Sequence, residues 1–293
     1  MSKIPTLKLN TGAEIPQLGF GTFAIKPPDA AAAVHTALTT GYRLIDTAKN
    51  YANEKEVGEG IARAGLPRGD LFVTTKLWIE DFGYDNAMRA FDASLSKLGL
   101  DYLDLYLLHW PVPMDFEPTV AAYKAVEKIK ADGRARAIGV SNFKPDHLRN
   151  LLDRTSVVPA VNQIELNPLF NQAALREANA RHGIVTESWS PIGGGKNVMH
   201  LLTNRQVGAI ATKHGKTPVQ VVLRWHLQHG LVAIPRSTNP KHIAENFDVF
   251  GFELAPADMA ALDGLETGER GGPDPDTFDL AAFKELVAQR DKK

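Results

Sequence analysis

Short apolar segments alternate with segments of helical pattern along this chain, and that alternation limits the possible folds more than any other feature. Each apolar run has the continuous hydrophobic character of a strand buried on both faces of a parallel sheet. The runs are residues 18–22, 43–48, 71–78, 103–110, 136–143, 160–166, 184–190 and 231–237. Eight strand and helix repeats predict an α/β protein with a closed (β/α)8 TIM barrel rather than an open sheet.

The segments between the runs carry signals for helix ends. Five of them finish in a basic or polar last turn followed by glycine, which is a helix-termination pattern. These glycines are Gly41, Gly99, Gly133, Gly183 and Gly230. At Thr217–Pro218 and Asn239–Pro240 an N-cap residue is followed by proline, which predicts two helix starts.

Three segments fall outside the alternation. Residues 6–18 predict a short N-terminal β-hairpin that turns at Asn10-Thr11-Gly12. Residues 193–216 are too long for a simple loop and predict an extra helix, whereas residues 268–279, rich in Gly, Pro and Asp, predict a surface loop. No linker divides the chain, so we expect one barrel domain over residues 1–293, with substrate loops near 111–118 and 268–279.

The composition excludes several classes of protein. The 44% hydrophobic content and 23% charged content are typical of a globular protein with a sizeable core. A net charge of −1 gives no general attraction for nucleic acid or an anionic membrane. The absence of cysteine excludes disulfides, thiolate metal sites and a cysteine nucleophile. The N-terminus has no apolar signal region, so we expect a cytoplasmic protein.

Polar side chains stand at the ends of three successive predicted strands. Asp46 ends the second run with Tyr51 in the next loop, Lys76 lies near the end of the third, and His109 lies near the end of the fourth. Each alone has an ordinary structural explanation, such as a helix cap or a buried histidine. Because strand C-termini meet at one face of a barrel, four such residues together predict an active site.

These four residues suit proton transfer to a carbonyl oxygen. A free tyrosine has a pKa of about 10, and a neighbouring ammonium group lowers the pKa by stabilising the phenolate. We therefore expect Lys76 to activate Tyr51 as a general acid, and Asp46 to neutralise the buried Lys76. Neutral His109 would hydrogen-bond the substrate carbonyl and orient it. No metal cage is evident.

The sequence resembles the aldo-keto reductase family over nearly its whole length. The motifs that carry the resemblance occur in the family's order: GYRLIDTAKNYANEKEVG (41–58), TTKLW (74–78), LLHWP (107–111), IGVSNF (138–143), VNQIELNP (161–168), SWSPIG (188–193) and IPRSTNPKHIAENF (234–247). The resemblance implies a (β/α)8 barrel that transfers a hydride between NADPH and a carbonyl. It assigns the catalytic tetrad to Asp46, Tyr51, Lys76 and His109.

The resemblance also implies the cofactor-binding residues. Ser141, Asn142 and Gln163 match the positions that hold the nicotinamide carboxamide, and Trp189 matches the aromatic ring that stacks on the nicotinamide. The other implied contacts are Gly21 and Thr22 at the end of the first strand; Ser190, Ile192 and Gly193 in the pyrophosphate loop; Arg236, Ser237 and Thr238 at the adenosine 2′-phosphate; and His242, Glu245 and Asn246 near the adenine.

Two positions refine this assignment. Many family members have tyrosine where this chain has Trp189, and tryptophan resembles the prokaryotic subgroup that contains 2,5-diketo-D-gluconate reductases. Many members also have arginine at the position of His242. Neutral imidazole attracts a phosphate less than guanidinium does, although Arg236 and Lys241 still favour an anion. We therefore expect NADPH to be preferred, with appreciable use of NADH.

Aromatic residues near the predicted rim indicate an apolar substrate pocket. Phe23, Trp78 and Trp110, together with Phe116, are the candidate walls. Arg270 is a candidate partner for a substrate carboxylate, although a solvated loop arginine is the simpler interpretation. The sequence leaves small aldehydes, dicarbonyls, aromatic aldehydes and keto-sugar acids open as the small-molecule partner, and it predicts a monomer.

Other patterns and functions were weighed against this one. Residues 19–24 match G-x-G-x-x-A, but a loop rather than a helix follows, which argues against a Rossmann site. His226 and His229 lack a third metal ligand. The alternatives to a reductase are an NADPH-binding sensor or regulatory subunit with slow turnover, and an aldolase-type barrel in which Lys76 forms a Schiff base.

Overall fold

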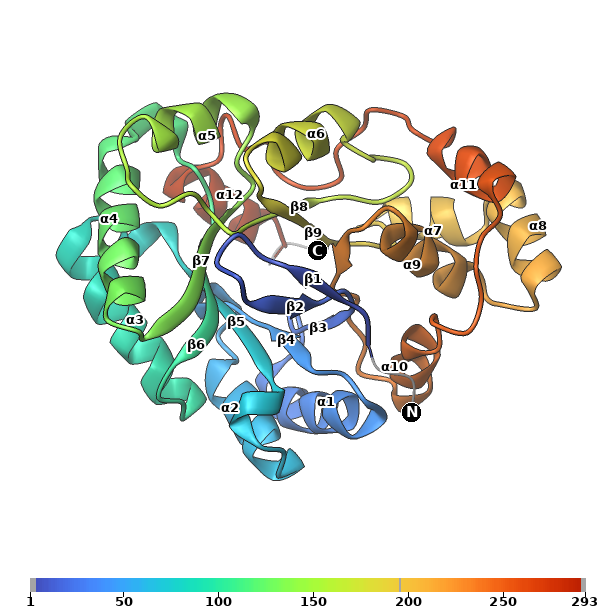
Figure 1. Cartoon of the computed structure of the whole chain (residues 1–293), viewed down its shortest axis with the longest axis horizontal. Helices are drawn as coiled ribbons and strands as arrows, with labels where there is room; N and C mark the ends of the chain where they lie inside the picture. The colour runs from blue at the N-terminus through green and yellow to red at the C-terminus, as the bar shows by residue number, and fades with distance from the viewer. Residues whose placement is uncertain (1–3, 195, 291–293) are drawn as a thin grey trace.

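The computed structural model describes residues 4–194 and 196–290, and its centre is an eight-stranded parallel barrel (Figure 1). The strands are β3 (Gly19–Gly21), β4 (Leu44–Asp46), β5 (Phe72–Leu77), β6 (Leu103–Leu108), β7 (Ala135–Ser141), β8 (Val161–Glu165), β9 (Val185–Trp189) and β10 (Val232–Ala233). Each strand pairs with the next in chain order. The predicted (β/α)8 barrel is confirmed.

The barrel closes where β3 meets β10. Leu18 forms a parallel bridge with Ala233, and the Ala233 N–H donates to the Gln17 carbonyl at 2.9 Å. At the last residue of β3 the seam is tight, because a Cβ atom on Gly21 would lie 2.9 Å from the backbone oxygen of Ile234, the residue after β10. Glycine at this position therefore lets the first and last strands approach.

Helices surround the barrel and leave its two ends for loops (Figure 1). They are α1 (Pro27–Thr40), α2 (Glu54–Ala64), α3 (Tyr84–Leu98), α4 (Glu117–Ala131), α5 (Pro145–Leu152), α6 (Ala173–Arg181), α7 (Lys196–Leu202), α8 (Arg205–His214), α9 (Pro218–Gln228), α10 (Pro240–Phe247), α11 (Pro256–Asp263) and α12 (Leu280–Arg290). The extra helix expected in residues 193–216 is two helices, α7 and α8.

The predicted helix signals act as caps. The Thr217 side chain accepts a hydrogen bond from the Gln220 N–H, and the Asn239 side chain accepts one from the Lys241 N–H. All five glycines that were expected to end helices have positive φ. These local signals therefore fix where α9 and α10 begin and where the other helices stop.

The N-terminal hairpin covers one end of the barrel. Its strands β1 (Thr6–Lys8) and β2 (Glu14–Pro16) are antiparallel, and Figure 1 shows them across the end that faces the viewer. Leu9 and Ile15 pack in one buried cluster with Leu44 and Phe72, the first residues of β4 and β5. The hairpin therefore closes the N-terminal end of the strands and leaves chemistry to the opposite end.

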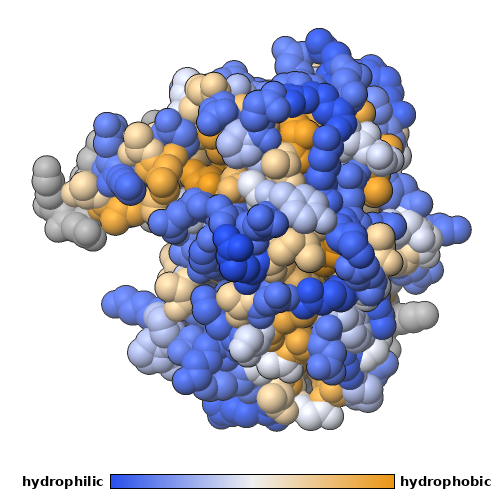
Figure 2. Space-filling model, turned by 90° about the vertical axis from the view of Figure 1, so that its left-hand side faces the viewer, coloured by the Kyte–Doolittle hydropathy of each residue, from blue (hydrophilic) through white to orange (hydrophobic). Residues whose placement is uncertain are grey.

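Burial follows the helix and strand patterns. All six residues of β5 are buried, including Lys76, whereas the helices keep their outer faces polar. Figure 2 shows a mainly hydrophilic surface on the side viewed, with apolar residues exposed in scattered patches. Among the described residues, no helix is both long enough and apolar enough to cross a membrane.

Backbone strain is concentrated at the C-terminal ends of the strands. The described non-glycine residues with positive φ are Ala24, Ala52, Val112, Asn142, Gln172 and Ser190. Each lies in a loop that follows a different barrel strand. Because such conformations persist only where surrounding contacts hold them, their position indicates that this face is shaped for a function.

Candidate active site

The structure brings the four predicted catalytic residues together around the ammonium group of Lys76. Its Nζ atom donates to Asp46 Oδ1 at 2.7 Å, to the Thr47 carbonyl at 2.9 Å and to Tyr51 Oη at 3.2 Å. The His109 ring meets the Tyr51 ring edge-on, with centroids 5.7 Å apart. Asp46, Tyr51, Lys76 and His109 are called the rim cluster below.

The loop that carries Tyr51 is fixed by the two polar residues of the YANE sequence. Asn53 is fully buried, and its Nδ2 atom donates to the carbonyls of Thr22 and Ile25, both at 3.0 Å. The next residue, Glu54, accepts a hydrogen bond from Thr75 Oγ1 at 2.7 Å. The loop after β4 is therefore tied to the loop after β3 and to β5, which fixes the phenol over Lys76.

Asp46 and Lys76 form a buried ion pair. Burial raises the pKa of Asp46, against the opposing effects of Lys76 and of the Gln163 amide. Burial alone would lower the pKa of Lys76, but its interactions with Asp46 and Tyr51, hydrogen bonds included, together outweigh burial and raise the pKa. Since the ammonium is held by three short hydrogen bonds, Lys76 keeps its charge at neutral pH.

The pKa of Tyr51 differs from the sequence expectation. Lys76 does lower this pKa, but burial has the larger and opposite effect, so that the pKa of Tyr51 rises to about 12. The expectation that Lys76 lowers the pKa of Tyr51 below its ordinary value was therefore wrong for the chain without a bound cofactor. The phenol is fully protonated at neutral pH, and Lys76 limits the energetic penalty of losing that proton.

His109 is neutral, as expected. Burial and the nearby charge of Lys76 hold the pKa of His109 well below its usual range. The ring packs edge-on against Trp78, with centroids 5.2 Å apart, and its Nδ1 atom has no partner among the described residues. A neutral imidazole with this orientation can share a hydrogen bond with a carbonyl oxygen beside Tyr51.

The residues assigned to the nicotinamide form a connected group beside the rim cluster. Trp189 Nε1 donates to Asn142 Oδ1 at 2.9 Å, and Asn142 Nδ2 donates to Ser141 Oγ at 3.1 Å and to the His109 carbonyl at 3.0 Å. Gln163 Nε2 donates to Asp46 Oδ2 at 2.8 Å. The predicted carboxamide site and the predicted catalytic residues are therefore directly linked.

The sequence interpretation missed two buried acids next to this group. Glu187, in β9, accepts a hydrogen bond from Gln163 Nε2 at 2.9 Å and is fully buried. Glu165, the last residue of β8, is also fully buried. The signal that could have revealed them is a carboxylate inside an otherwise apolar strand, as in IVTESWS and VNQIEL.

Glu165 anchors the C-terminal loop over the nicotinamide residues. Its two carboxylate oxygens accept from the backbone N–H groups of Gly271 and Gly272, at 2.8 and 3.0 Å. A Cβ atom on Gly272 would lie 2.6 Å from the Trp189 ring, so the loop passes directly against that ring. Arg270 is 17% exposed and lies 3.7 Å from Glu165, so it is a loop anchor rather than a solvated side chain.

The residues assigned to the pyrophosphate form a turn in the loop after β9. Ser190 and Gly193 have positive φ, the Gly193 N–H donates to the Ser190 carbonyl at 2.8 Å, and Ile192 is partly buried between them. A Cβ atom on Gly193 would lie 2.8 Å from the Asn197 carbonyl carbon. Glycine here leaves a narrow backbone turn that suits close approach of a diphosphate.

The basic stretch, residues 236–242, suits a phosphate. Arg236, Lys241 and His242 are exposed, and none of them forms an ion pair with the described residues. The N-terminus of α10 lies in the same stretch and favours negative charge. Ser237 and Thr238 add hydroxyl groups beside these cations. The residues present therefore fit the 2′-phosphate of NADPH.

Of the residues expected near the adenine and at the end of the first strand, Glu245 and Thr22 already have partners within the protein. Glu245 accepts from Thr217 Oγ1 at 2.7 Å, and Asn246 is buried in α10. Gly21 forms the barrel seam described above. Thr22 Oγ1 donates to the Asp46 carbonyl at 3.0 Å. Thr22 therefore supports the rim cluster through the backbone.

The aromatic residues expected to line the substrate pocket divide into two groups. Phe23 is 49% exposed and meets the Tyr51 ring edge-on, with centroids 5.1 Å apart. Trp78 and Trp110 are buried beneath Phe278, and the ring centroids of Phe278 and Trp110 are 4.2 Å apart. Phe116 packs on Phe143 and is buried. The C-terminal segment therefore covers part of the expected pocket wall.

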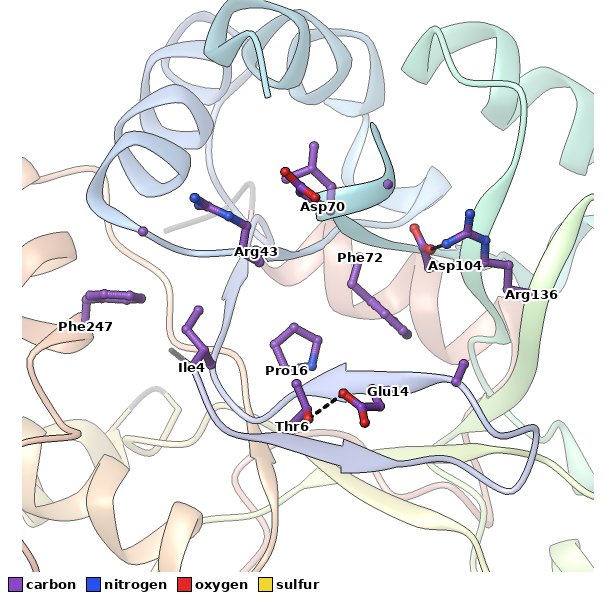
Figure 3. Close-up of a pocket in the computed structure, with 14 residues that line it drawn as sticks. Ile4, Thr6, Glu14, Pro16, Arg43, Asp70, Phe72, Asp104, Arg136 and Phe247 are labelled. Atoms are coloured by element: carbon purple, nitrogen blue, oxygen red, sulfur yellow. Dashed lines mark hydrogen bonds and ion pairs between the residues drawn. The ribbon is translucent and has the colours of Figure 1, made fainter. Parts of the chain in front are cut away.

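A hollow of about 660 Å³ lies at the opposite end of the barrel, between the hairpin and the first residues of several strands (Figure 3). Most of its charged lining residues have partners: Arg136 lies 3.2 Å from Asp104, Glu14 accepts from Thr6 at 2.9 Å, and Arg43 donates to the carbonyls of Leu38 and Tyr42. Because the rim cluster occupies the C-terminal ends of the strands, we assign no part of the reaction to this hollow.

Metal chemistry has no support in the described residues, because they contain no group of three or more potential ligands. His226 is fully buried, with Nδ1 2.8 Å from the Val222 carbonyl and Nε2 3.2 Å from Ser188 Oγ. His229 instead contacts Asp263 at 2.8 Å. Both histidines are structural.

Comparison with known proteins agrees with this geometry. A sequence model described as Aldo/keto reductase family matches residues 17–267. Morphine 6-dehydrogenase from Pseudomonas putida is 53% identical, over 97% of this chain and 99% of that protein. A Gox0644 mutant in complex with NADPH is 44% identical with a TM-score of 0.90, covering 95% of this chain and all of that one. The Bombyx mori aldo-keto reductase in complex with NADP is 33% identical with a TM-score of 0.87, covering 97% and 98%.

Proposed function

The chain belongs to the aldo/keto reductase family, and from this premise we propose how its own residues carry out the reaction. The protein is an oxidoreductase that reduces an aldehyde or ketone to an alcohol with NADPH. Tyr51 is the general acid, Lys76 and Asp46 activate it, and His109 orients the carbonyl. The observation that carries these roles is the position of Lys76 Nζ between Asp46 Oδ1 and Tyr51 Oη, at 2.7 and 3.2 Å.

Bound NADPH supplies a hydride to the carbonyl carbon. Tyr51 Oη donates its proton to the carbonyl oxygen, so that the alcohol forms without a free alkoxide. The resulting phenolate is stabilised by the ammonium of Lys76, which Asp46 holds in place. Contacts within the chain hold this hydrogen-bonded geometry, which reduces reorganisation during the reaction.

The nucleotide is held, in our proposal, mainly by three parts of the C-terminal half of the barrel, with a further contribution from the end of β3. Ser141, Asn142, Gln163 and Trp189 hold the nicotinamide, and Ser190, Ile192 and Gly193 lie along the pyrophosphate. The 2′-phosphate is bound by Arg236, Ser237 and Thr238, with His242, Glu245 and Asn246 near the adenine and Gly21 and Thr22 beside the nicotinamide. Since His242 is a weaker anion partner than arginine, NADH is also accepted.

We propose a bulky apolar carbonyl as the substrate rather than a keto acid. Three cations around the rim are already engaged: Lys49 with Asp81, Lys144 with Asp274 and Asp276, and Arg270 with Glu165. The exposed ring of Phe23 therefore provides free apolar surface beside Tyr51. The name of the morphine 6-dehydrogenase relative also suggests a fused-ring alcohol or ketone.

The finer assignments are also part of this proposal. Trp189 supports membership of the subgroup that contains 2,5-diketo-D-gluconate reductases. This membership concerns common descent and does not assign the substrate. Residues 1–293 act as one barrel domain and as a cytoplasmic monomer, in which loops 111–118 and 268–279 border the substrate.

The alternative functions have less support. None of the relatives described above is named as a regulatory subunit. Lys76 is fully buried, and its three protons are used in hydrogen bonds, which argues against a Schiff-base nucleophile.

The Tyr51→Phe variant tests the proposed role of the phenol. We expect kcat for reduction to fall by about 10³-fold, because the proton donor is lost, while NADPH binds as in the wild type. Loss of NADPH absorbance with a panel of aromatic aldehydes and cyclic ketones measures the rate, and fluorescence titration measures binding. A variant with wild-type kcat would remove Tyr51 from its assigned role.

A further inference from the structure

A second buried carboxyl group lies next to the rim cluster, and the reaction as described does not use it. The side chain of Glu187 is fully buried, and its Oε2 atom accepts from Gln163 Nε2 at 2.9 Å. The same nitrogen donates to Asp46 Oδ2 at 2.8 Å. One amide nitrogen therefore joins the carboxyl groups of Asp46 and Glu187.

The charges around Glu187 do not balance if both carboxyl groups are ionised. Lys76 uses its three protons on Asp46, Thr47 and Tyr51, so none remains for Glu187. The second oxygen of Glu187, Oε1, is buried and has no partner among the described residues. An isolated buried carboxylate is strongly disfavoured, so Glu187 retains its proton.

The groups around Glu187 also favour its protonated form. Burial, and then the charge of Asp46, raise the pKa of Glu187 to about 8, against the smaller effects of Gln163 and Lys76. In the paired strands, Gln163 of β8 and Val232 of β10 lie beside it in register. On the neighbouring elements, Glu165 is bound to the C-terminal loop, and Arg176 of α6 lies over the Trp225 ring.

We propose that Glu187 is a positioning residue whose neutral carboxyl group keeps a second negative charge away from the phenolate that forms on Tyr51. The inference rests on the proposed role of Tyr51. With neutral Glu187, the cluster passes from no net charge to one negative charge when Tyr51 gives up its proton. With ionised Glu187 it would pass from one to two, which opposes proton transfer.

The first test is the pH dependence of kcat for the wild type and Glu187→Gln, a variant of similar shape that cannot ionise. The probe reaction is reduction of 4-nitrobenzaldehyde with NADPH, from about pH 6 to about pH 10. We expect wild-type kcat to fall about fivefold or more above pH ~8, and the variant to stay within about twofold of its neutral rate. A variant with the wild-type fall would overturn the proposal.

Two further variants separate charge from structure. Glu187→Asp keeps a carboxyl group, so we expect it to retain the alkaline fall in kcat. An alkaline fall that is lost in Glu187→Asp as well would mean that shape rather than ionisation matters. Glu253→Gln removes an exposed carboxylate paired with Arg224 and is the matched control. It should keep the wild-type profile.

Thermal unfolding tests the proton on Glu187 without any catalysis. Because the pKa is raised in the folded protein, the folded state binds more protons than the unfolded state between pH ~4.5 and ~8. Wild-type stability should therefore fall as pH rises through this window, and the Tm advantage of Glu187→Gln over wild type should widen. A pH-independent difference would show that Glu187 is ionised and would overturn the proposal. This result is independent of whether Tyr51 is the proton donor.

Discussion

The rim cluster and the basic stretch both handle charge, but they do so in opposite ways. In the rim cluster Lys76 is fully buried, and each of its protons has a partner. In the basic stretch Arg236 and Lys241 are exposed and form no ion pair with the described residues. The first arrangement fixes a geometry for chemistry, whereas the second keeps charge available for a ligand.

The difference implies that equal changes in side-chain charge should have unequal effects in the two regions. A buried charge interacts strongly with its neighbours, because little water screens it, and removing its partner leaves it uncompensated. An exposed charge is screened by water and salt. The variants below test that contrast from the largest expected effect to the smallest.

Lys76→Met removes the centre of the rim cluster and should have the largest effect. We expect kcat to fall by about 10³-fold or more, because the phenolate of Tyr51 loses its stabilising charge and Asp46 is left without its cation. Single-turnover rates with saturating NADPH measure the chemical step. A fall of less than about tenfold would contradict the assigned role.

Asp46→Asn should have a smaller effect on rate, because Asp46 acts through Lys76. We expect kcat to fall by about 10- to 100-fold and stability to fall by about 3 kcal/mol, since the buried ammonium loses its counter-charge. Urea denaturation followed by circular dichroism measures stability. If Asp46→Asn were as inactive as Lys76→Met, Asp46 would have a more direct part in the reaction.

Gly272→Val tests the C-terminal loop, which passes against Trp189 and Glu165. A Cβ atom at this position would lie 2.6 Å from the Trp189 ring and 3.3 Å from Glu165 Oε2. We expect the NADPH Kd to rise by about tenfold with a smaller change in kcat, because the loop or the stacking ring must move. Gly251→Val, with nothing within 4 Å of a Cβ atom, is the matched control.

His242→Arg should have the smallest effect and lies entirely in the basic stretch. We expect the ratio of kcat/KM for NADPH over NADH to rise by about three- to tenfold, and the gain to shrink at high salt. Arg236→Met should change the ratio in the opposite direction. An unchanged ratio in both variants would place the 2′-phosphate elsewhere.

The two ends of the barrel give a second contrast. Six non-glycine residues with positive φ in the described chain follow barrel strands at the catalytic end. At the other end, the hairpin seals the strands with Leu9 and Ile15, and Arg136 pairs with Asp104 beside the hollow. The strain is therefore placed where the loops must shape a site, and stability is provided from the opposite end.

The sequence by itself determined the barrel, several helix ends and the residues at one rim. Hydrophobic periodicity and caps such as Thr217 and Asn239 depend on neighbours within a few residues, so they can be read along the chain. Parallel strands then require their C-terminal residues to meet at one face. This was enough to bring Asp46, Tyr51, Lys76 and His109 together.

Only the tertiary structure decided which charges pair and which protons are held. Glu165 accepts from the N–H of Gly271, and Gln163 donates to both Asp46 and Glu187. The Glu165–Gly271 and Gln163–Asp46 contacts each join residues about a hundred or more positions apart in the chain. The pKa of Tyr51 rises rather than falls, because burial outweighs Lys76. Burial and Coulomb interactions depend on distances through space, and the order of residues along the chain does not specify those distances.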